Sequence, residues 1–193
     1  NDENGIQKLV LSRVKKVPLP NDFSINTYFT DVCNAYTHSF NYFIYIPNQC
    51  TWIGATPEEL IVEHQNHFTT VSLAGTRAIS DPNPFGEKER EEQAIVTDYI
   101  KNVLTKKGSH FTVPENASEV IAGNLRHLKS IFKIDKTLSA LTLAKVLHPT
   151  PAICGFPKQE AQDFIIKNEG FNRKFYSGFL GMISPKENYI YVN

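Results

Sequence analysis

Lys8 and Glu58 are the two residues whose types and settings best suit acid–base chemistry. Lys8 opens the apolar run Leu9-Val10-Leu11, and burial in a strand there would lower the pKa of its amine and make it a usable base. Glu58 follows the sequence Gly54-Ala55-Thr56-Pro57, which predicts a helix that begins after Thr56. The structural alternatives are an exposed lysine at a strand end and a glutamate that complements a helix dipole. Because positions 8 and 58 are 50 residues apart, the two side chains cannot share a helix and must converge from separate elements.

A second pair of carboxylates, Glu89 and Glu92, lies near the start of a predicted long helix. The two are three positions apart in the sequence Lys88-Glu89-Arg90-Glu91-Glu92-Gln93, so they share one helix face. Two carboxylates placed in this way could hold a hard cation such as Mg²⁺. A solvated acidic helix start is the structural alternative.

Five further residues could contact a ligand. Gly75 and Thr76 directly follow a predicted strand, where their backbone N–H groups could hold an anionic oxygen. His148 begins the sequence His148-Pro149-Thr150-Pro151, whose prolines would fix the direction of its ring, although a histidine that caps a helix explains the position equally well. Tyr176 and Gly178 lie where a glycine permits close approach of the backbone, by a ligand or by a neighbouring strand.

These residues need helices and strands to bring them together. Antiparallel strand pairs alternate with single helices, without a regular strand–helix–strand repeat, so we predict an α+β fold of antiparallel sheets flanked by helices. The sequence patterns predict helices over 24–36, from 56 onward, and over 86–107, 137–147 and 157–168, and strands over 8–14, 40–46, 50–55, 68–73, 120–122, 127–134, 173–183 and 189–192.

The composition indicates a neutral globular protein. Its 193 residues carry 20 Lys+Arg and 20 Asp+Glu, a balance that gives no general attraction to nucleic acid or to an anionic membrane. With 41% hydrophobic residues the chain is too apolar to be disordered, and it has no apolar run of about eighteen residues that would predict a transmembrane helix. Three cysteines without a CxxC motif exclude a disulfide scaffold and a zinc ribbon, and we expect Cys154 to be a buried, inert thiol. We therefore expect a reduced, cytoplasmic protein.

Six segments, taken in order, resemble the chorismate-utilising enzymes and most closely their isochorismate synthase branch. They run from Lys8 to Gly181, nearly the whole chain, so the set is far more specific than any one motif. The segments are Lys8–Arg13, Gly54–Glu58, Leu73–Arg77, Glu87–Gln93, Leu147–Ala152 and Arg173–Gly181.

Three positions favour the isochorismate synthase branch within that family. Lys8 resembles the water-activating base of isochorismate and salicylate synthases, where anthranilate synthases usually carry glutamine. Ala74 stands where aminodeoxychorismate synthases tend to carry a lysine, and the run His148–Ala152 resembles the isochorismate synthase form. The alternatives are a salicylate or anthranilate synthase-like enzyme, and a non-catalytic structural fragment with an incomplete site.

The resemblance implies an Mg²⁺-dependent isomerase that converts chorismate to isochorismate, for menaquinone or siderophore biosynthesis. Lys8 would activate water for attack at C2, and Glu58 would protonate the departing C4 hydroxyl. Glu92 would ligate the metal, with Glu89 as a direct or water-bridged helper. The resemblance also implies a monomer whose partner is its small-molecule substrate rather than nucleic acid or a membrane. The substrate-binding residues that it implies are Gly75, Thr76, His148, Tyr176 and Gly178.

The chain departs from the family pattern at several points. Gln93 replaces the histidine usual after the metal-binding glutamate, Lys174 replaces a glycine, and the connection between Thr76 and Lys88 is short. The chain also closes on a strand-like run that ends at Asn193, where the family continues with a substrate-binding arginine, a glycine-rich loop and a second metal-binding glutamate. We therefore expect residues 1–193 to be a partial chorismate-binding catalytic core that lacks the C-terminal part of the family domain. Alone, it is expected to bind chorismate and Mg²⁺ poorly and to turn over little.

Overall fold

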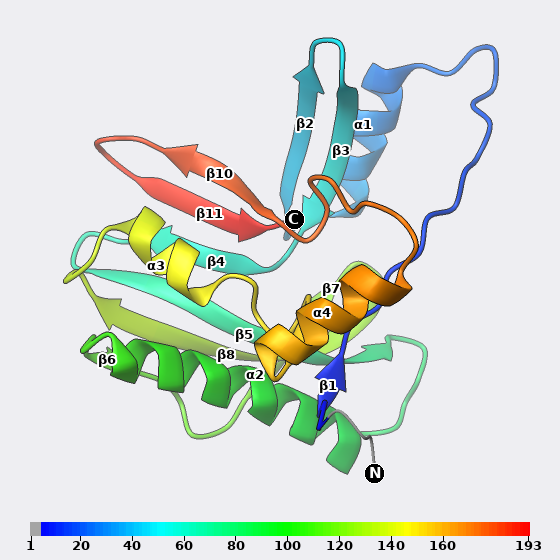
Figure 1. The fold of residues 1–193 in the computed structure, drawn as a ribbon. Coiled ribbons are helices and arrows are strands. Elements are labelled where there is room, and N and C mark those ends of the chain that lie inside the picture. The colour runs from blue at the N-terminus through cyan, green and yellow to red at the C-terminus, as the bar shows by residue number, and fades with distance from the viewer. Residues whose placement is uncertain (1–4) are drawn as a thin grey trace.

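The computed structural model describes residues 5–193, so the polar opening of the chain at 1–4 lies outside the described residues. Within this range, helices and antiparallel strands are mixed along the chain (Figure 1), which confirms the predicted α+β class. The helices are α1 (Ile25–Ala35), α2 (Glu87–Lys106), α3 (Ala140–Leu147) and α4 (Lys158–Asn168). The strands are β1 (Lys8–Leu9), β2 (Phe40–Ile46), β3 (Cys50–Thr56), β4 (Glu59–Glu63), β5 (His67–Ala78), β6 (Phe111–Thr112), β7 (Ser118–Ala122), β8 (Leu125–Asp135), β9 (Gly155–Phe156), β10 (Phe179–Ile183) and β11 (Asn188–Val192).

A seven-stranded antiparallel sheet forms the body of the molecule. Its strands are hydrogen-bonded in the order β10-β11-β4-β5-β8-β6, and β7 also pairs with β8. The longest pairing joins β5 to β8, from His67 opposite Asp135 to Ala78 opposite Leu125. The β2–β3 hairpin is a separate two-stranded sheet that packs against α1, and β1 pairs with β9 (Figure 1).

Helices α2 and α3 pack on the main sheet and complete its apolar core. Ile100 and Leu104 of α2 are fully buried together with Leu143 and Leu147 of α3 and with Phe132 of β8. Burial of each such side chain contributes about 1.5–3 kcal/mol. The cluster therefore holds the C-terminal half of α2 against the sheet.

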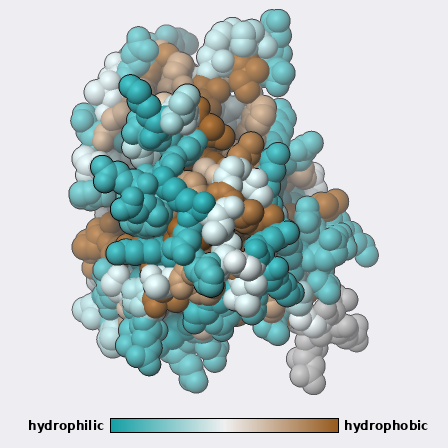
Figure 2. Space-filling model, turned by 90° about the vertical axis from the view of Figure 1, so that its left-hand side faces the viewer, coloured by the Kyte–Doolittle hydropathy of each residue, from teal (hydrophilic) through white to brown (hydrophobic). Residues whose placement is uncertain are grey.

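The surface and the cysteines agree with a globular domain. The side of the molecule in Figure 2 is largely hydrophilic, and its apolar residues form separate patches. None of the helices in residues 5–193 has the length and apolar character needed to cross a bilayer. The three cysteines are free, and Cys154 is buried, as predicted.

The helix predicted from Thr56 onward is wrong, because this segment forms strand β4. Leu60 and Ile61 are almost fully buried, and β4 pairs with β11 on one side and with β5 on the other. Burial in the middle of a sheet here outweighs the local signal for a helix start. Glu58 consequently lies in the short link between β3 and β4 and not at a helix N-terminus.

Strand β5 passes through a β-bulge at Gly75, although the sequence predicted that the strand would end at Leu73. The pairing with β8 shifts between Ala74 and Thr76, which leaves Gly75 without a partner residue. Gly75 has a φ of +64°, and a Cβ there would lie 2.8 Å from the backbone oxygen of Glu89 in α2. Glycine therefore permits the bulge and also lets the first turn of α2 approach the sheet.

Strand β1 is shorter than the predicted strand over 8–14. Lys8 pairs with Phe156 and Leu9 with Gly155, and pairing stops there. Residues 13–22 are exposed and lie outside any helix or strand. The last hairpin is also shorter than predicted, since β10 begins at Phe179 and not at Arg173.

Candidate active site

A cavity of about 260 Å³ lies at the bulge of β5 and is lined by residues from widely separated parts of the chain. Pockets for small molecules commonly measure roughly 300–1,000 Å³, so this cavity suits a compact ring compound. The lining residues are Lys8, Thr56, Pro57, Glu58, Leu73, Ala74, Gly75, Thr76, Glu92, His127 and Ala152.

Lys8 enters the cavity from the short strand β1. The N–H of Gln7 donates to the Phe156 carbonyl at 2.8 Å, and the N–H of Val10 donates to the Cys154 carbonyl at 2.9 Å, so the backbone on both sides of Lys8 is tied to the segment around β9. Burial lowers the pKa of Lys8, and the nearby charges of Glu92 and Glu58 oppose this effect without reversing it. The amine is therefore displaced toward its neutral form.

Glu58 enters the cavity from the link between β3 and β4. Its backbone is held at both ends, because its N–H donates to Thr56 Oγ1 at 3.3 Å and its carbonyl accepts from the Val192 N–H at 3.0 Å. Burial raises the pKa of Glu58 to about 7, although a hydrogen bond from Thr150 and the charge of Lys8 both act to lower it. The Thr150 hydroxyl lies 3.4 Å from Glu58 Oε1. The carboxyl is thus able to carry a proton near neutral pH.

The cavity perturbs Lys8 and Glu58 in opposite directions. An ordinary lysine–glutamate pair is charged on both sides, whereas burial here favours the uncharged form of each. A neutral amine can accept a proton and a neutral carboxyl can donate one. Shifts of both pKa values toward neutrality are what a general base and a general acid require.

Of the two predicted metal ligands, Glu92 lines the cavity and Glu89 does not. Glu89 Oε2 accepts hydrogen bonds from the Gly86 N–H at 2.8 Å and from Arg77 Nη2 at 3.2 Å. The Gly86 N–H and then the Arg77 guanidinium hold the pKa of Glu89 below its usual range, so this carboxylate caps α2. In residues 5–193 no group of three or more His, Cys, Asp or Glu side chains could hold a metal ion. Of the two predicted ligands, Glu92 is therefore the one that could offer an oxygen to a cation in this cavity.

Two residues of this site were not singled out from the sequence. His127 lines the cavity, its Nδ1 lies 3.1 Å from Thr76 Oγ1, and burial lowers its pKa. Thr150 is buried and contacts Glu58 from 92 positions away. The register of β5 against β8 sets Thr76 opposite His127, so only knowledge of that pairing would have indicated the histidine.

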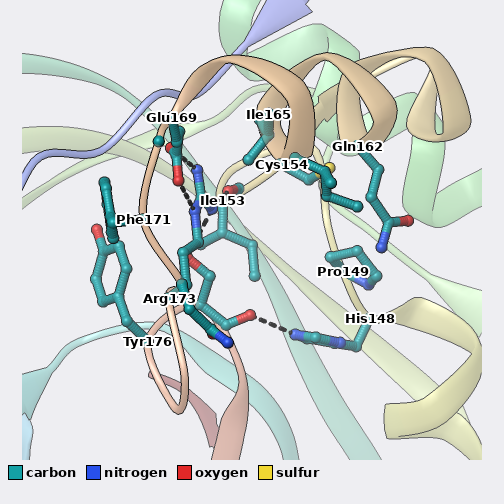
Figure 3. A pocket seen from close by; sticks show the side chains of 14 residues that line it. His148, Pro149, Ile153, Cys154, Gln162, Ile165, Glu169, Phe171, Arg173 and Tyr176 are labelled. Carbon is teal, nitrogen blue, oxygen red and sulfur yellow. Dashed lines mark hydrogen bonds and ion pairs between the residues drawn. The ribbon is translucent and has the colours of Figure 1, made fainter.

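The predicted substrate-binding residues are divided among three cavities. Gly75 and Thr76 line the cavity of Lys8, whereas His148 and Tyr176 line a larger one of about 800 Å³ (Figure 3). His148 Nε2 lies 2.9 Å from the Ser177 carbonyl, which turns the ring toward that cavity. Gly178 lines a third cavity of about 270 Å³ beside the β2–β3 hairpin. The larger cavity, as the described residues form it, has no counterpart of the Lys8–Glu58 pair.

Comparison with known proteins identifies the family to which the chain belongs and several related enzymes. The family model described as chorismate binding enzyme matches residues 1–190. The isochorismate synthase EntC of Escherichia coli strain K12 is 29% identical over 195 residues, which cover 95% of this chain and 50% of EntC.

Two of the solved structures that share the fold are isochorismate synthases by their titles. The crystal structure titled as a 2,3-dihydroxybenzoate-specific isochorismate synthase, DhbC of Bacillus anthracis, superposes with a TM-score of 0.77 at 27% identity, over 88% of this chain and 50% of that one. The menaquinone-specific isochorismate synthase MenF of Escherichia coli superposes with a TM-score of 0.69 at 23% identity, over 80% of this chain and 38% of that one, and shows likeness of fold. The chain spans about half the length of the curated relatives that it matches.

Proposed function

Because the chain belongs to the family of chorismate binding enzymes, we propose that it forms part of the catalytic core of an isochorismate synthase. The observation that carries the proposal is the opposite perturbation of Lys8 and Glu58 in one cavity. The reaction would convert chorismate to isochorismate, and the product would serve menaquinone or siderophore biosynthesis.

In the proposed reaction Lys8 is the base and Glu58 is the acid. The neutral amine of Lys8 takes a proton from a water molecule as the water oxygen bonds to C2 of the ring. The ring double bonds shift, the C4–O bond breaks, and Glu58 gives its proton to the departing oxygen, which leaves as water. One water enters and one leaves, so the reaction is an isomerisation. Proton exchange with solvent then returns Lys8 and Glu58 to their neutral forms.

The rest of the cavity would bind the substrate. Glu92 would hold Mg²⁺, whose charge would neutralise a carboxylate of the substrate. The N–H groups of Gly75 and Thr76, at the bulge, would donate to a carboxylate oxygen. His148 and Tyr176 line a different cavity, so the proposal assigns them no role in these steps.

The test follows the oxygen atom. In H₂¹⁸O with Mg²⁺, the longest natural chain that carries residues 1–193 is expected to convert chorismate to isochorismate with the label at C2, as read by mass spectrometry. Lys8→Met and Glu58→Gln are each expected to slow this conversion by about 10²–10⁴-fold. Lys16→Met, at an exposed position, is the matched control and should leave the rate unchanged.

Two results would contradict the assignment. Full activity in Lys8→Met would show that Lys8 is not the base. An unlabelled oxygen at C2 would show that water does not attack C2. Release of pyruvate would indicate salicylate synthase-like chemistry instead. Residues 1–193 alone are still expected to turn over little, so a negative result with that segment does not count against the mechanism.

A further inference from the structure

A partly buried ion pair between Glu169 and Arg173 connects the end of α4 to the N-terminal segment. Both oxygens of Glu169 accept hydrogen bonds from Arg173 (Figure 3), with Arg173 Nε at 2.6 Å, and the two side chains are only 3% and 16% exposed. Arg173 also donates to the Val10 carbonyl at 2.9 Å, the Ile153 carbonyl at 3.1 Å and Ser177 Oγ at 2.9 Å. All five N–H donors of the guanidinium are therefore used.

The same carboxylate holds Ser12. Glu169 Oε1 accepts from the backbone N–H of Ser12 at 2.7 Å and from its hydroxyl at 2.9 Å. Beyond Ser12, residues 13–22 are exposed and lie outside any helix or strand. Ser12 is thus the last residue held by the body of the molecule before the connection to α1.

Lys8 depends on this fixation because its strand is so short. Strand β1 has two residues, and its partner β9 also has two. A pairing of two residues supplies few hydrogen bonds, so it opens easily unless other contacts hold the segment. The pairing with β9 holds residues 7–10, and the ion pair holds residues 10 and 12 from a second direction.

Stabilisation of helix α4 does not explain why a glutamate stands at position 169. It is the C-terminal cap of α4, where the helix dipole disfavours a carboxylate. Hydrogen bonds from Arg173 and then from Ser12 lower the pKa of Glu169 to about 2, so the group is ionised near neutral pH. A buried ion pair adds little stability when compared with apolar packing, but loss of one partner leaves an uncompensated charge.

We infer that Glu169 and Arg173 are positioning residues, which fix the backbone of residues 10–12 and thereby keep the Lys8 amine in the cavity with Glu58. Neither side chain lines that cavity, so both act through the chain and not on the substrate. The inference rests on the proposed function, because the position of Lys8 matters only if Lys8 is the base.

The experiment compares Glu169→Gln with Glu63→Gln in the chain of residues 1–193. Glu63 is the matched control because it forms a comparable ion pair, with Lys136 at 2.6 Å, on strand β4. Hydrogen exchange of the Val10 and Ser12 amides is expected to be about tenfold faster or more in Glu169→Gln, with β5 and β8 unchanged. The second readout is the titration of Lys8, methylated with ¹³C at its amine, followed by NMR and assigned with Lys8→Arg. Its pKa is expected to rise toward that of a free lysine in Glu169→Gln and to stay low in Glu63→Gln.

The outcomes separate the inference from the proposed function. In one outcome the pKa of Lys8 is low in the unmodified sequence and stays low in Glu169→Gln, and amide exchange at residues 10 and 12 is also unchanged. This outcome overturns the inference and leaves the proposed function standing. An ordinary Lys8 pKa in the unmodified sequence overturns the proposed function and the inference with it. If Glu169→Gln does not fold, the same two measurements are made on Ser12→Ala. It removes one hydrogen bond to Glu169 and leaves the ion pair intact, and it should shift both readouts in the same direction by a smaller factor.

Discussion

Replacing Glu58 with glutamine should change the way in which the stability of the chain depends on pH. Glutamine keeps the shape of the side chain and can still accept the hydrogen bond from Thr150, but it carries no titratable proton. Comparison with this variant therefore isolates the free energy of ionising the Glu58 carboxyl in the folded state.

The magnitude follows from the pKa of Glu58, which burial raises from 4.5 to about 7. Between these values the folded chain keeps a proton that the unfolded chain has already released. Stability from this group is thus fully present below the unfolded pKa and is lost as the pH rises through the folded pKa. At about 1.4 kcal/mol per pKa unit, the free energy of unfolding should fall by about 2.5 kcal/mol between about pH 5 and about pH 8.

The assay is urea unfolding of both sequences at the two pH values, followed by the fluorescence of Trp52, the single tryptophan. His67, His127 and His148, whose pKa values burial lowers, are present in both sequences, so their contributions cancel in the comparison. The difference between the two pH dependences is therefore the contribution of Glu58. Parallel pH dependences, equal within about 0.5 kcal/mol, would refute the claim that Glu58 is protonated near neutral pH.

Two further predictions concern the walls of the cavity. Gly75→Ala should destabilise the chain by about 3 kcal/mol or more in urea unfolding, because its backbone has positive φ and the added methyl group would meet the backbone of α2. Gly108→Ala, which has a similar φ of +67° but open space around the added Cβ, should lose only about 1–2 kcal/mol, and equal losses would contradict the argument from packing. Thr150→Val should raise the pKa of Glu58 further, since the hydrogen bond that it removes lowers that pKa; a ¹³C NMR titration of the Glu58 carboxyl measures the shift, and a lower pKa would contradict the assignment.

Local sequence patterns predicted most of the elements, and they failed where the sheet core imposes its own requirements. Helices α1, α2 and α4 and the β2–β3 hairpin follow apolar spacing and turn residues that any short window of sequence contains. The segment after Thr56 has the composition of a helix start, yet it forms β4 because Leu60 and Ile61 fill the centre of a sheet. A local sequence pattern does not show that distant strands will pair with this segment and bury its side chains.

The site was predictable to the extent that its residues are unusual for their surroundings. The apolar run at Lys8 left open a buried amine or an exposed strand-end lysine, and the structure half-buries the residue. Thr150 and His127 carry no such sign, because each acquires its place only through a partner far along the chain, Glu58 for one and Thr76 for the other. Long-range pairing, which the sequence does not display, decides their roles.

The pairing of β1 with β9 has a consequence for how the active site comes into being. It joins Lys8 to Phe156, so Lys8 reaches the cavity only after a loop of nearly 150 residues has closed. The β2–β3 and β10–β11 hairpins close over a few residues each, and the entropy lost on closure grows with loop length. Chains that have folded their hairpins and helices can therefore still lack Lys8 in the cavity. The lowered pKa of Lys8 thus reports that distant parts of the chain have met, which a spectroscopic measure of helix and sheet content does not.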